Sequence, residues 1–363
     1  MLPIGMRYCL VPQQSLGIQS VASPLEFKFK ARQMDRLSLS PVRFVIALVA
    51  VCLTQSLTLG VEAAEIVLSF DDAPLPDGWS LVGNERTDRL IEVLEEKGAP
   101  PVVFYATPRG GGGENLARLR RYGEAGHFIA NHTNDHPDLG SVSAQEFIQS
   151  ISRAEDILSP IPNYKKWFRY PYLNEGGGTK EKALLVKAYL TESGYRPGYV
   201  TVETFDWYID RRISDEAAKG NVIDQAAWTR FYVSMIVESI ELSDNFAVSL
   251  LGRSPVHVVL LHENDLNALS LPALVDGLRQ AGHTLVSPEA AFFDPIADAR
   301  WDQHRFSQRR LLAIAAERDN PGKLDSRWLD TDYIDQRLRA AGLLCQGEYF
   351  FCSWSPWLCE QFC

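Results

Sequence analysis

The stretch Glu65–Pro74, with the sequence EIVLSFDDAP, constrains the fold more than any other part of the chain. Large apolar side chains fill four of its first six positions, a pattern typical of a buried strand in a parallel sheet. Asp71 and Asp72 follow, and Pro74 ends the strand. Two adjacent carboxylates are costly to bury unless a cation or a basic side chain compensates them. The pair is therefore a solvated turn or a functional site, and partners elsewhere in the chain decide between the two.

The overall composition is that of a globular protein with an acidic balance. The chain has 363 residues, of which 46% are hydrophobic and 23% charged, which allows one large domain or two ordinary ones. Its formal net charge is −10, although residues 1–43 carry six basic and two acidic side chains. Because a phosphate-binding surface needs clustered Lys and Arg, nucleic acid is excluded as the main partner.

The region before the first strand has the organisation of an export signal. Residues 43–64 combine a basic flank, an apolar centre and a small-residue end, with Val61 and Ala63 at the −3 and −1 positions of a cleavage site. We therefore predict a signal peptide over residues 34–63 and an exported protein, located in the periplasm, in the cell envelope or outside the cell. Residues 1–33 fit poorly before such a signal, and we interpret them as an over-long start or a disordered lead-in.

Two other readings of the same segment remain open. An uncleaved membrane anchor is one, although the apolar centre is short for a bilayer. A lipid anchor on Cys52 is the other, and it is disfavoured because Val51 is large where a small residue is needed.

After the first strand, helical and strand patterns alternate, which predicts a parallel sheet covered by helices. A capping box of Ser143 and Glu146 opens one of the helices. The other predicted helices cover residues 85–97, 116–125, 179–193, 224–242 and 271–281, and the strands cover residues 101–107, 127–131, 167–170, 198–202, 256–261 and 284–286. Both a doubly wound sheet and a closed barrel fit this alternation.

The positions of the polar residues favour the barrel. Polar side chains stand at or just beyond the carboxyl ends of five predicted strands. In a barrel these ends meet at one mouth, whereas a doubly wound sheet brings together only those at its switch point. The residues concerned are Asp71, Asp72, His132, Arg169, Asp206 and His262.

His132 and His136 form a candidate metal site. On one helical turn, side chains four residues apart face the same way, so both imidazoles can reach one metal ion. Two surface histidines beside a loop are the alternative. A carboxylate from another strand end would complete a set of three ligands, which leaves coordination positions open as in catalytic sites.

The sequence resembles the polysaccharide deacetylases of carbohydrate esterase family 4. It shows the five short motifs of this family in order, from about residue 65 to residue 290. Each motif is weak alone, and the ordered set is specific. The usual Gly after the paired Asp residues is Ala73 here. The motifs are Ser69–Asp72, His132–His136, Arg169–Tyr172, Asp206–Trp207 and Leu260–His262.

The resemblance implies that Asp72, His132 and His136 hold the metal and that Asp71 is the catalytic base. A bound divalent metal lowers the pKa of its water to roughly 7 and polarises the substrate carbonyl. Two imidazoles and one carboxylate suit zinc, cobalt or nickel better than magnesium, which prefers oxygen ligands. We expect zinc, on grounds of availability.

The resemblance assigns the remaining motif residues as well. His262 would be the acid that protonates the leaving nitrogen, and Arg169 would steady the base. Asp206 would orient either Arg169 or His262. The backbone N–H of Tyr172 would help to hold the oxyanion. Trp207 would form an apolar wall of the groove, with plain core packing as its alternative.

These residues predict a hydrolase that acts on non-peptide carbon–nitrogen bonds. We expect metal-bound water to remove N-acetyl, or O-acetyl, groups from a poly- or oligosaccharide, and the membrane to be involved only if the signal is uncleaved. The resemblance implies an α/β fold, a distorted (β/α) barrel of about seven parallel strands, over residues 64–298. A catalytically silent carbohydrate-binding protein and an amide hydrolase for a non-acetyl substrate are the alternatives. Loops such as residues 208–220 would determine the substrate specificity.

Residues 299–363 are predicted to be a small C-terminal extension of unknown role. The last nineteen residues hold four Cys and several aromatic side chains. In an exported protein four Cys suggest two disulfides, with three possible connectivities. This stretch would be either an aromatic sugar-binding knob or a frameshifted terminus.

Overall fold

The computed structural model describes residues 63–109, 112–176, 179–298, 308–319 and 321–344. The lead-in, the predicted signal peptide except for residue 63, and the Cys-rich end lie outside these residues. Within the described ranges, we find no helix with the length and apolarity needed to cross a bilayer.

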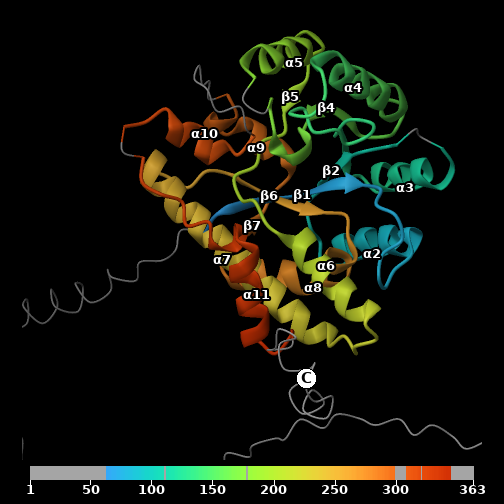
Figure 1. Cartoon of the computed structure of the whole chain (residues 1–363), viewed down its shortest axis with the longest axis vertical. Helices are drawn as coiled ribbons and strands as arrows, with labels where there is room; N and C mark the ends of the chain where they lie inside the picture. The colour runs from blue at the N-terminus through green and yellow to red at the C-terminus, as the bar shows by residue number, and fades with distance from the viewer. Residues whose placement is uncertain (1–62, 110–111, 177–178, 299–307, 320, 345–363) are drawn as a thin grey trace, which may run out of the picture. The chain divides into compact units, whose positions relative to one another are not determined.

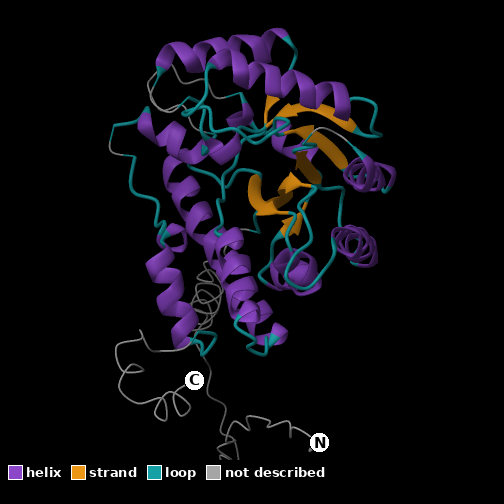
Figure 2. Cartoon of the chain, turned by 45° about the vertical axis from the view of Figure 1, so that its right-hand side comes forward, coloured by secondary structure: helices purple, strands orange, loops and turns teal. Residues whose placement is uncertain are grey.

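The centre of the domain is a sheet of seven parallel strands, which confirms the predicted sheet and its approximate strand number. Along the sheet the order is β5-β4-β3-β2-β1-β6, and β7 pairs with the start of β1. Helices surround the strands (Figure 2). The strands are β1 (Glu65–Ala73), β2 (Val103–Ala106), β3 (Phe128–Asn131), β4 (Tyr164–Phe168), β5 (Arg196–Pro197), β6 (His257–His262) and β7 (Thr284–Leu285).

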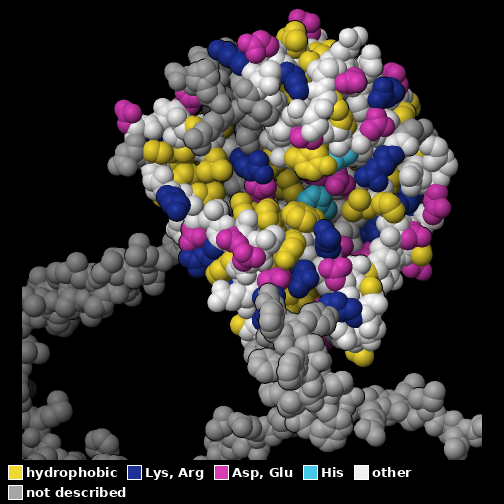
Figure 3. Space-filling model, in the orientation of Figure 1, with side chains coloured by type: hydrophobic (Ala, Val, Ile, Leu, Met, Phe, Trp, Pro, Cys, Tyr) yellow, Lys and Arg dark blue, Asp and Glu magenta, His cyan; other side chains and the backbone are white. Residues whose placement is uncertain are grey.

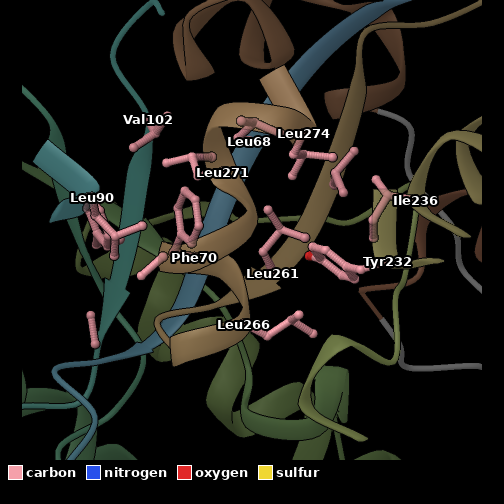
Figure 4. Close-up of a cluster of buried hydrophobic side chains, with 14 of the residues drawn as sticks. Leu68, Phe70, Leu90, Val102, Tyr232, Ile236, Leu261, Leu266, Leu271 and Leu274 are labelled. Carbon is pink, nitrogen blue, oxygen red and sulfur yellow. The ribbon is translucent and has the colours of Figure 1, made fainter. Parts of the chain in front are cut away.

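Strand β1 lies between β2 and β6 in the sheet (Figure 1). Its apolar run is buried, as the sequence predicts. Leu68 and Phe70 point into the main hydrophobic core, where they meet Leu261 of β6 and Leu271 (Figure 4). Full burial of one such side chain stabilises the fold by roughly 1.5–3 kcal/mol. The core thereby fixes β1, whose carboxyl end carries the paired carboxylates.

Each predicted helix is present, but the helix predicted over residues 224–242 extends to Leu251, and the helix predicted over residues 271–281 begins at Asp265. The capping box is confirmed, because Glu146 N–H donates to Ser143 Oγ and the Glu146 carboxylate accepts from Ser143 N–H. Residues 208–220, predicted to be a loop, are mostly helix α6, whose Ile209 and Ile213 are buried one turn apart. The helices are α2 (Gly83–Glu96), α3 (Gly113–Glu124), α4 (Ala144–Leu158), α5 (Lys180–Glu192), α6 (Asp206–Ala218), α7 (Gln225–Leu251), α8 (Asp265–Gln280) and α9 (Pro288–Phe293).

The segment 196–202 curls the sheet into a distorted barrel. Its first residues pair with β4 as β5, and Val202 forms a parallel bridge with Val259 of β6. One short segment thus contacts both edges of the sheet. The barrel that the strand-end polar residues predict is confirmed.

The described C-terminal residues pack against this barrel. Arg309 forms a parallel bridge with Val200, so the chain adds a further extended segment beside residues 196–202. Trp328, Ile334 and Leu338 join the main hydrophobic core. The elements here are α10 (Arg310–Ala316), the 3₁₀ turn η3 (Arg327–Leu329) and α11 (Thr331–Ala340).

Candidate active site

A bulge at the end of β1 brings both paired carboxylates to the mouth of the barrel. Asp71 still pairs in register with His262 of β6, but the register with β2 shifts between Asp71 and Ala73. Asp72 has a φ of 66°, a conformation that non-glycine residues rarely adopt. In a regular strand, adjacent side chains point to opposite faces. The bulge removes that alternation, and both side chains line the same groove.

Asp72, His132 and His136 form a cluster that can hold a metal ion. One potential ligand atom from each residue lies within 4.8 Å of the others. Asp72 Oδ1 is 3.5 Å from Nε2 of His132 and 3.1 Å from Nε2 of His136. The sequence correctly singles out these residues as neighbours.

The two histidines do not lie on a helical turn, so that part of the prediction is wrong. The chain leaves β3 at Asn131 and passes through a loop in which Thr133 and His136 have φ values of 69° and 55°. His136 N–H donates to Thr133 Oγ1 at 3.0 Å, which folds the loop back on itself. This irregular turn, and not helical spacing, aims both rings at Asp72.

The hydrogen bonds around the cluster show that it suits a cation. Nδ1 of His132 lies 2.7 Å from the carbonyl oxygen of Arg169 and must donate to it, so Nε2 presents a lone pair to Asp72. Burial, together with nearby His136, lowers the pKa of His132 to about 3, which keeps the ring neutral. Oδ1 of Asp72 is buried without a hydrogen-bond partner. An imidazole lone pair and an unpaired carboxylate oxygen that face each other are the ligands of a divalent transition metal.

Asp71 is held by a buried guanidinium beneath the mouth. Nη1 of Arg169 donates to Asp71 Oδ1 at 2.6 Å and to Ser69 Oγ at 2.8 Å. Arg169 is fully buried, and its guanidinium stacks 3.9 Å from the ring centre of Tyr105. Burial raises the pKa of Asp71 despite the opposing effect of Arg169. The result is an oriented carboxylate that is more basic than an exposed one.

His262 is paired with Asp206 on the other side of the groove. Its Nδ1 lies 2.8 Å from Asp206 Oδ1, and its backbone N–H donates to Asp206 Oδ2 at 2.7 Å. Burial opposes the charged imidazole, but the carboxylates of Asp206, Asp72 and Asp71 outweigh it and raise the pKa of His262 to about 10. His262 is therefore a protonated group at neutral pH, with Nε2 as its remaining donor.

The structure decides which partner lies against Asp206. Asp206 forms two hydrogen bonds with His262, so its partner is the histidine and not Arg169. Asn267 Nδ2 also donates to Asp206 Oδ2 at 2.7 Å. These contacts outweigh burial and lower the pKa of Asp206, which keeps it an anion.

Tyr172 and Trp207 stand at the open side of the groove. Tyr172 is 61% exposed and Trp207 is 42% exposed, and both line the groove. Core packing is therefore the wrong interpretation of Trp207. Tyr172 and Leu173 have φ values of 59° and 55°, so a second strained turn lies at the mouth. Histidine side chains are visible near the middle of this face, among hydrophobic and acidic ones (Figure 3).

Three charged groove residues are absent from the sequence prediction. Asp210 lies one turn after Asp206 on α6, so helical spacing could have found it. Glu203 and Arg309 pair with each other across the groove wall, at 2.5 Å between Glu203 Oε2 and Arg309 Nε. Their sequence separation leaves no local signal that could have linked them.

A buried ionic network supports the end of β6 from below. Glu263, which follows His262, accepts two hydrogen bonds from Arg118 Nη2, at 2.7 and 3.0 Å, and one from Tyr122. It also accepts from the backbone N–H of Leu75, at 2.6 Å, in the loop after β1. This network ties the strand end that carries His262 to the loop that follows the paired carboxylates.

The fold and the site together define a class: a parallel (β/α) barrel with a candidate metal centre, a buried Asp–Arg pair and a His–Asp pair at the carboxyl ends of its strands. Residues 60–190 match the model of the polysaccharide deacetylase family. The resemblance predicted from the motifs is thereby confirmed over the segment that contains the first three of them.

Similar proteins include a peptidoglycan-N-acetylglucosamine deacetylase of Bacillus cereus, 28% identical over 165 residues, which are 44% of this chain and 51% of the relative. A chitooligosaccharide deacetylase of Azorhizobium caulinodans is 28% identical over 180 residues, or 47% of this chain and 77% of the relative. The chain thus spans about half the length of the first relative. The solved chitin deacetylase of Colletotrichum lindemuthianum aligns with 68% of this chain and 94% of its own, at 20% identity and a TM-score of 0.45.

Proposed function

We propose that this protein is a metal-dependent hydrolase that removes acetyl groups from the nitrogen atoms of an acetylated poly- or oligosaccharide. The observation that carries the proposal is the geometry of one groove, in which a metal-binding cluster lies beside an oriented carboxylate and a protonated imidazole. An amide resists hydrolysis, so it needs an activated water, charge stabilisation at oxygen and a proton for the amine. The deacetylase names of the relatives support this class of substrate.

Asp72, His132 and His136 would hold the metal. When bound, a divalent metal supplies a more acidic water and a polarised carbonyl. The neutral state of His132 suits this role, because a ligand imidazole must be unprotonated. Among the metals, zinc is our first choice, with cobalt and nickel as alternatives that the same ligands accept.

Asp71 acts as the general base. It lies 3.8 Å from His132 Nε2, which places its carboxylate next to the metal cluster. Its raised pKa makes it a better proton acceptor, and Arg169 fixes its orientation. A carboxylate so placed takes a proton from the attacking water without moving.

His262 acts as the general acid. It enters the reaction protonated, because its pKa is raised to about 10, and Nε2 gives a proton to the departing nitrogen. Asp206 holds Nδ1 and therefore keeps the opposite ring nitrogen directed away from α6. The backbone N–H of Tyr172 would stabilise the oxyanion, and the exposed ring of Trp207 would contact a sugar face.

Export by the predicted signal segment would bring the enzyme to a glycan of the cell envelope, outside the cytoplasm. The same residues serve an O-acetyl ester, because the attack on the carbonyl is unchanged and an alkoxide replaces the amine as leaving group. We propose N-acetyl groups first, since the protonated acid that His262 provides is most needed by an amine.

Acetate release tests the proposal. Purified protein is incubated with N-acetylglucosamine oligomers and with acetylated xylan, with and without a chelator. We expect chelator-sensitive release from the oligomers, restored by zinc. Release from both substrates that no chelator affects would refute the metal mechanism. Binding of oligomers without release, with every divalent metal, would show a catalytically silent carbohydrate-binding protein.

A further inference from the structure

The groove is also lined by a residue of the described C-terminal segment, which lies outside the family motifs. Residues 308–310 run alongside Val200, where Val200 N–H donates to the carbonyl of Gln308 and Arg310 N–H donates to the carbonyl of Val200. Gln308 also donates its backbone N–H to Leu173, the neighbour of Tyr172. These contacts place Arg309 in the groove wall, next to the turn that carries Tyr172.

Arg309 meets Glu203 in a two-pronged ion pair. Arg309 Nε donates to Glu203 Oε2 at 2.5 Å and Nη2 donates to Oε1 at 2.6 Å. The side chains are 35% and 15% exposed, so both remain accessible from the groove. Glu203 precedes Thr204, whose hydroxyl donates to the carbonyl of Leu260 at 2.6 Å. Backbone and side-chain contacts therefore fix the pair on both sides.

We propose that Arg309 and Glu203 form a sugar-binding subsite, which binds hydroxyl groups of the neutral sugar unit next to the one that is deacetylated. This inference rests on the proposed function and names a determinant of its substrate. A carboxylate accepts more hydrogen bonds than the two it receives from Arg309, and sugar hydroxyls are donors that fit it. Because the pair carries no net charge and Asp210 lies nearby in the groove, the subsite favours a neutral glycan over an anionic one.

The aromatic residues beside the pair support a sugar as the occupant. Phe205 and Trp207 follow Glu203 on the same segment, their rings 5.3 Å apart, and both line the groove. Aromatic rings pack against the apolar face of a sugar, and charged groups next to them bind its hydroxyls. Both kinds of side chain line the groove that also contains Tyr172 and His262.

Arg309→Gln and Glu203→Gln test the subsite. We measure kcat/KM for the tetramer of β-1,4-linked N-acetylglucosamine and for 4-nitrophenyl acetate, which has no neighbouring sugar. Each variant should lower the ratio of the two values by roughly tenfold, the effect of one lost hydrogen bond to a charged group. Arg121→Gln removes a surface arginine paired with Asp88, and serves as the matched control with an unchanged ratio.

Calorimetric titration with the same tetramer decides the inference independently of turnover. We expect both variants to bind it roughly tenfold more weakly than the wild type, with thermal unfolding monitored to detect a structural effect. Equal loss on both substrates together with unchanged tetramer binding would assign the pair a purely structural role and overturn the inference. If the wild type binds the tetramer through this pair but never releases acetate, the proposed function fails and the subsite stands.

Discussion

Asp206→Asn tests whether the charge of Asp206 keeps His262, the acid of the proposed reaction, protonated. Asp206 contacts both Nδ1 and the backbone N–H of His262, and its charge is the largest of the influences that raise the pKa of the imidazole. The substitution keeps the shape of the side chain and removes the charge. Burial, the largest influence and the one that opposes the charged imidazole, remains, and only the smaller effects of Asp72 and Asp71 offset it. The pKa of His262 should therefore fall from about 10 to about 6.5, the value of an unperturbed imidazole, or below it.

The size of the effect on rate follows from the protonated fraction. At pH 8, a group with a pKa near 10 is almost fully protonated, whereas one with a pKa of about 6.5 is ~3% protonated. If His262 is the general acid, Asp206→Asn should lower kcat/KM about 30-fold at pH 8 through this effect alone. The loss should shrink as the pH falls towards 6, because the imidazole of the variant is then protonated again.

The assay is the pH dependence of acetate release between pH 5 and pH 10.5. For the wild type we expect the alkaline limb near pH 10, and for the variant a limb that is more than three pH units lower. Asp210→Asn is the matched control, since Asp210 lies one turn further along α6 and accepts hydrogen bonds from Trp79 and Leu266 instead. A variant of Asp206 whose alkaline limb coincides with that of the wild type would refute the reasoning.

Three further predictions follow from the site and its supports. Asp72→Asn should weaken metal binding, whereas Asp71→Asn should keep nearly all the metal and lower kcat by roughly 10²–10⁴, measured by elemental analysis and acetate release; the opposite pattern would reverse the two roles. Dialysis against a chelator should abolish activity, and stoichiometric magnesium without a transition metal in the isolated protein would contradict the site. Gln308→Ala leaves the buried N–H of Tyr170 without its 2.7 Å partner and should lower the free energy of unfolding by about 2 kcal/mol in urea titration.

The barrel could be predicted because its signals are local. The run before Asp71 reads as a buried strand, and the capping box of Ser143 and Glu146 marks a helix start, because each pattern depends on residues a few positions apart. Convergence of the strand-end residues then follows from the parallel arrangement, in which all carboxyl ends lie at one edge. The local strand signals and the shared strand edge together predict that the residues of the candidate metal cluster lie close to one another.

The loop geometry could not be predicted in the same way. Helical spacing correctly predicts that His132 and His136 lie together, but not how they do so. Thr133 and His136 adopt φ values that a helix excludes, so a loop brings the two rings together. Helix α6 was predictable, because Ile209 and Ile213 carry an ordinary amphipathic signal directly after the Asp206–Trp207 motif in its first turn.

The strained turns explain how loops of this kind can hold ligands precisely. Asp72, His136 and Tyr172 all have positive φ, each of which costs of order 1–3 kcal/mol for a non-glycine residue and persists only where the surroundings enforce it. In this protein, two contacts beneath the groove hold the turns in place. They are the Arg169–Asp71 pair and the hydrogen bond from His132 to the carbonyl of Arg169. Arg169 therefore links Asp71, the proposed base, to the candidate metal cluster. A substitution of Arg169 would therefore disturb both Asp71 and the metal cluster, even though the arginine is fully buried and does not line the groove itself.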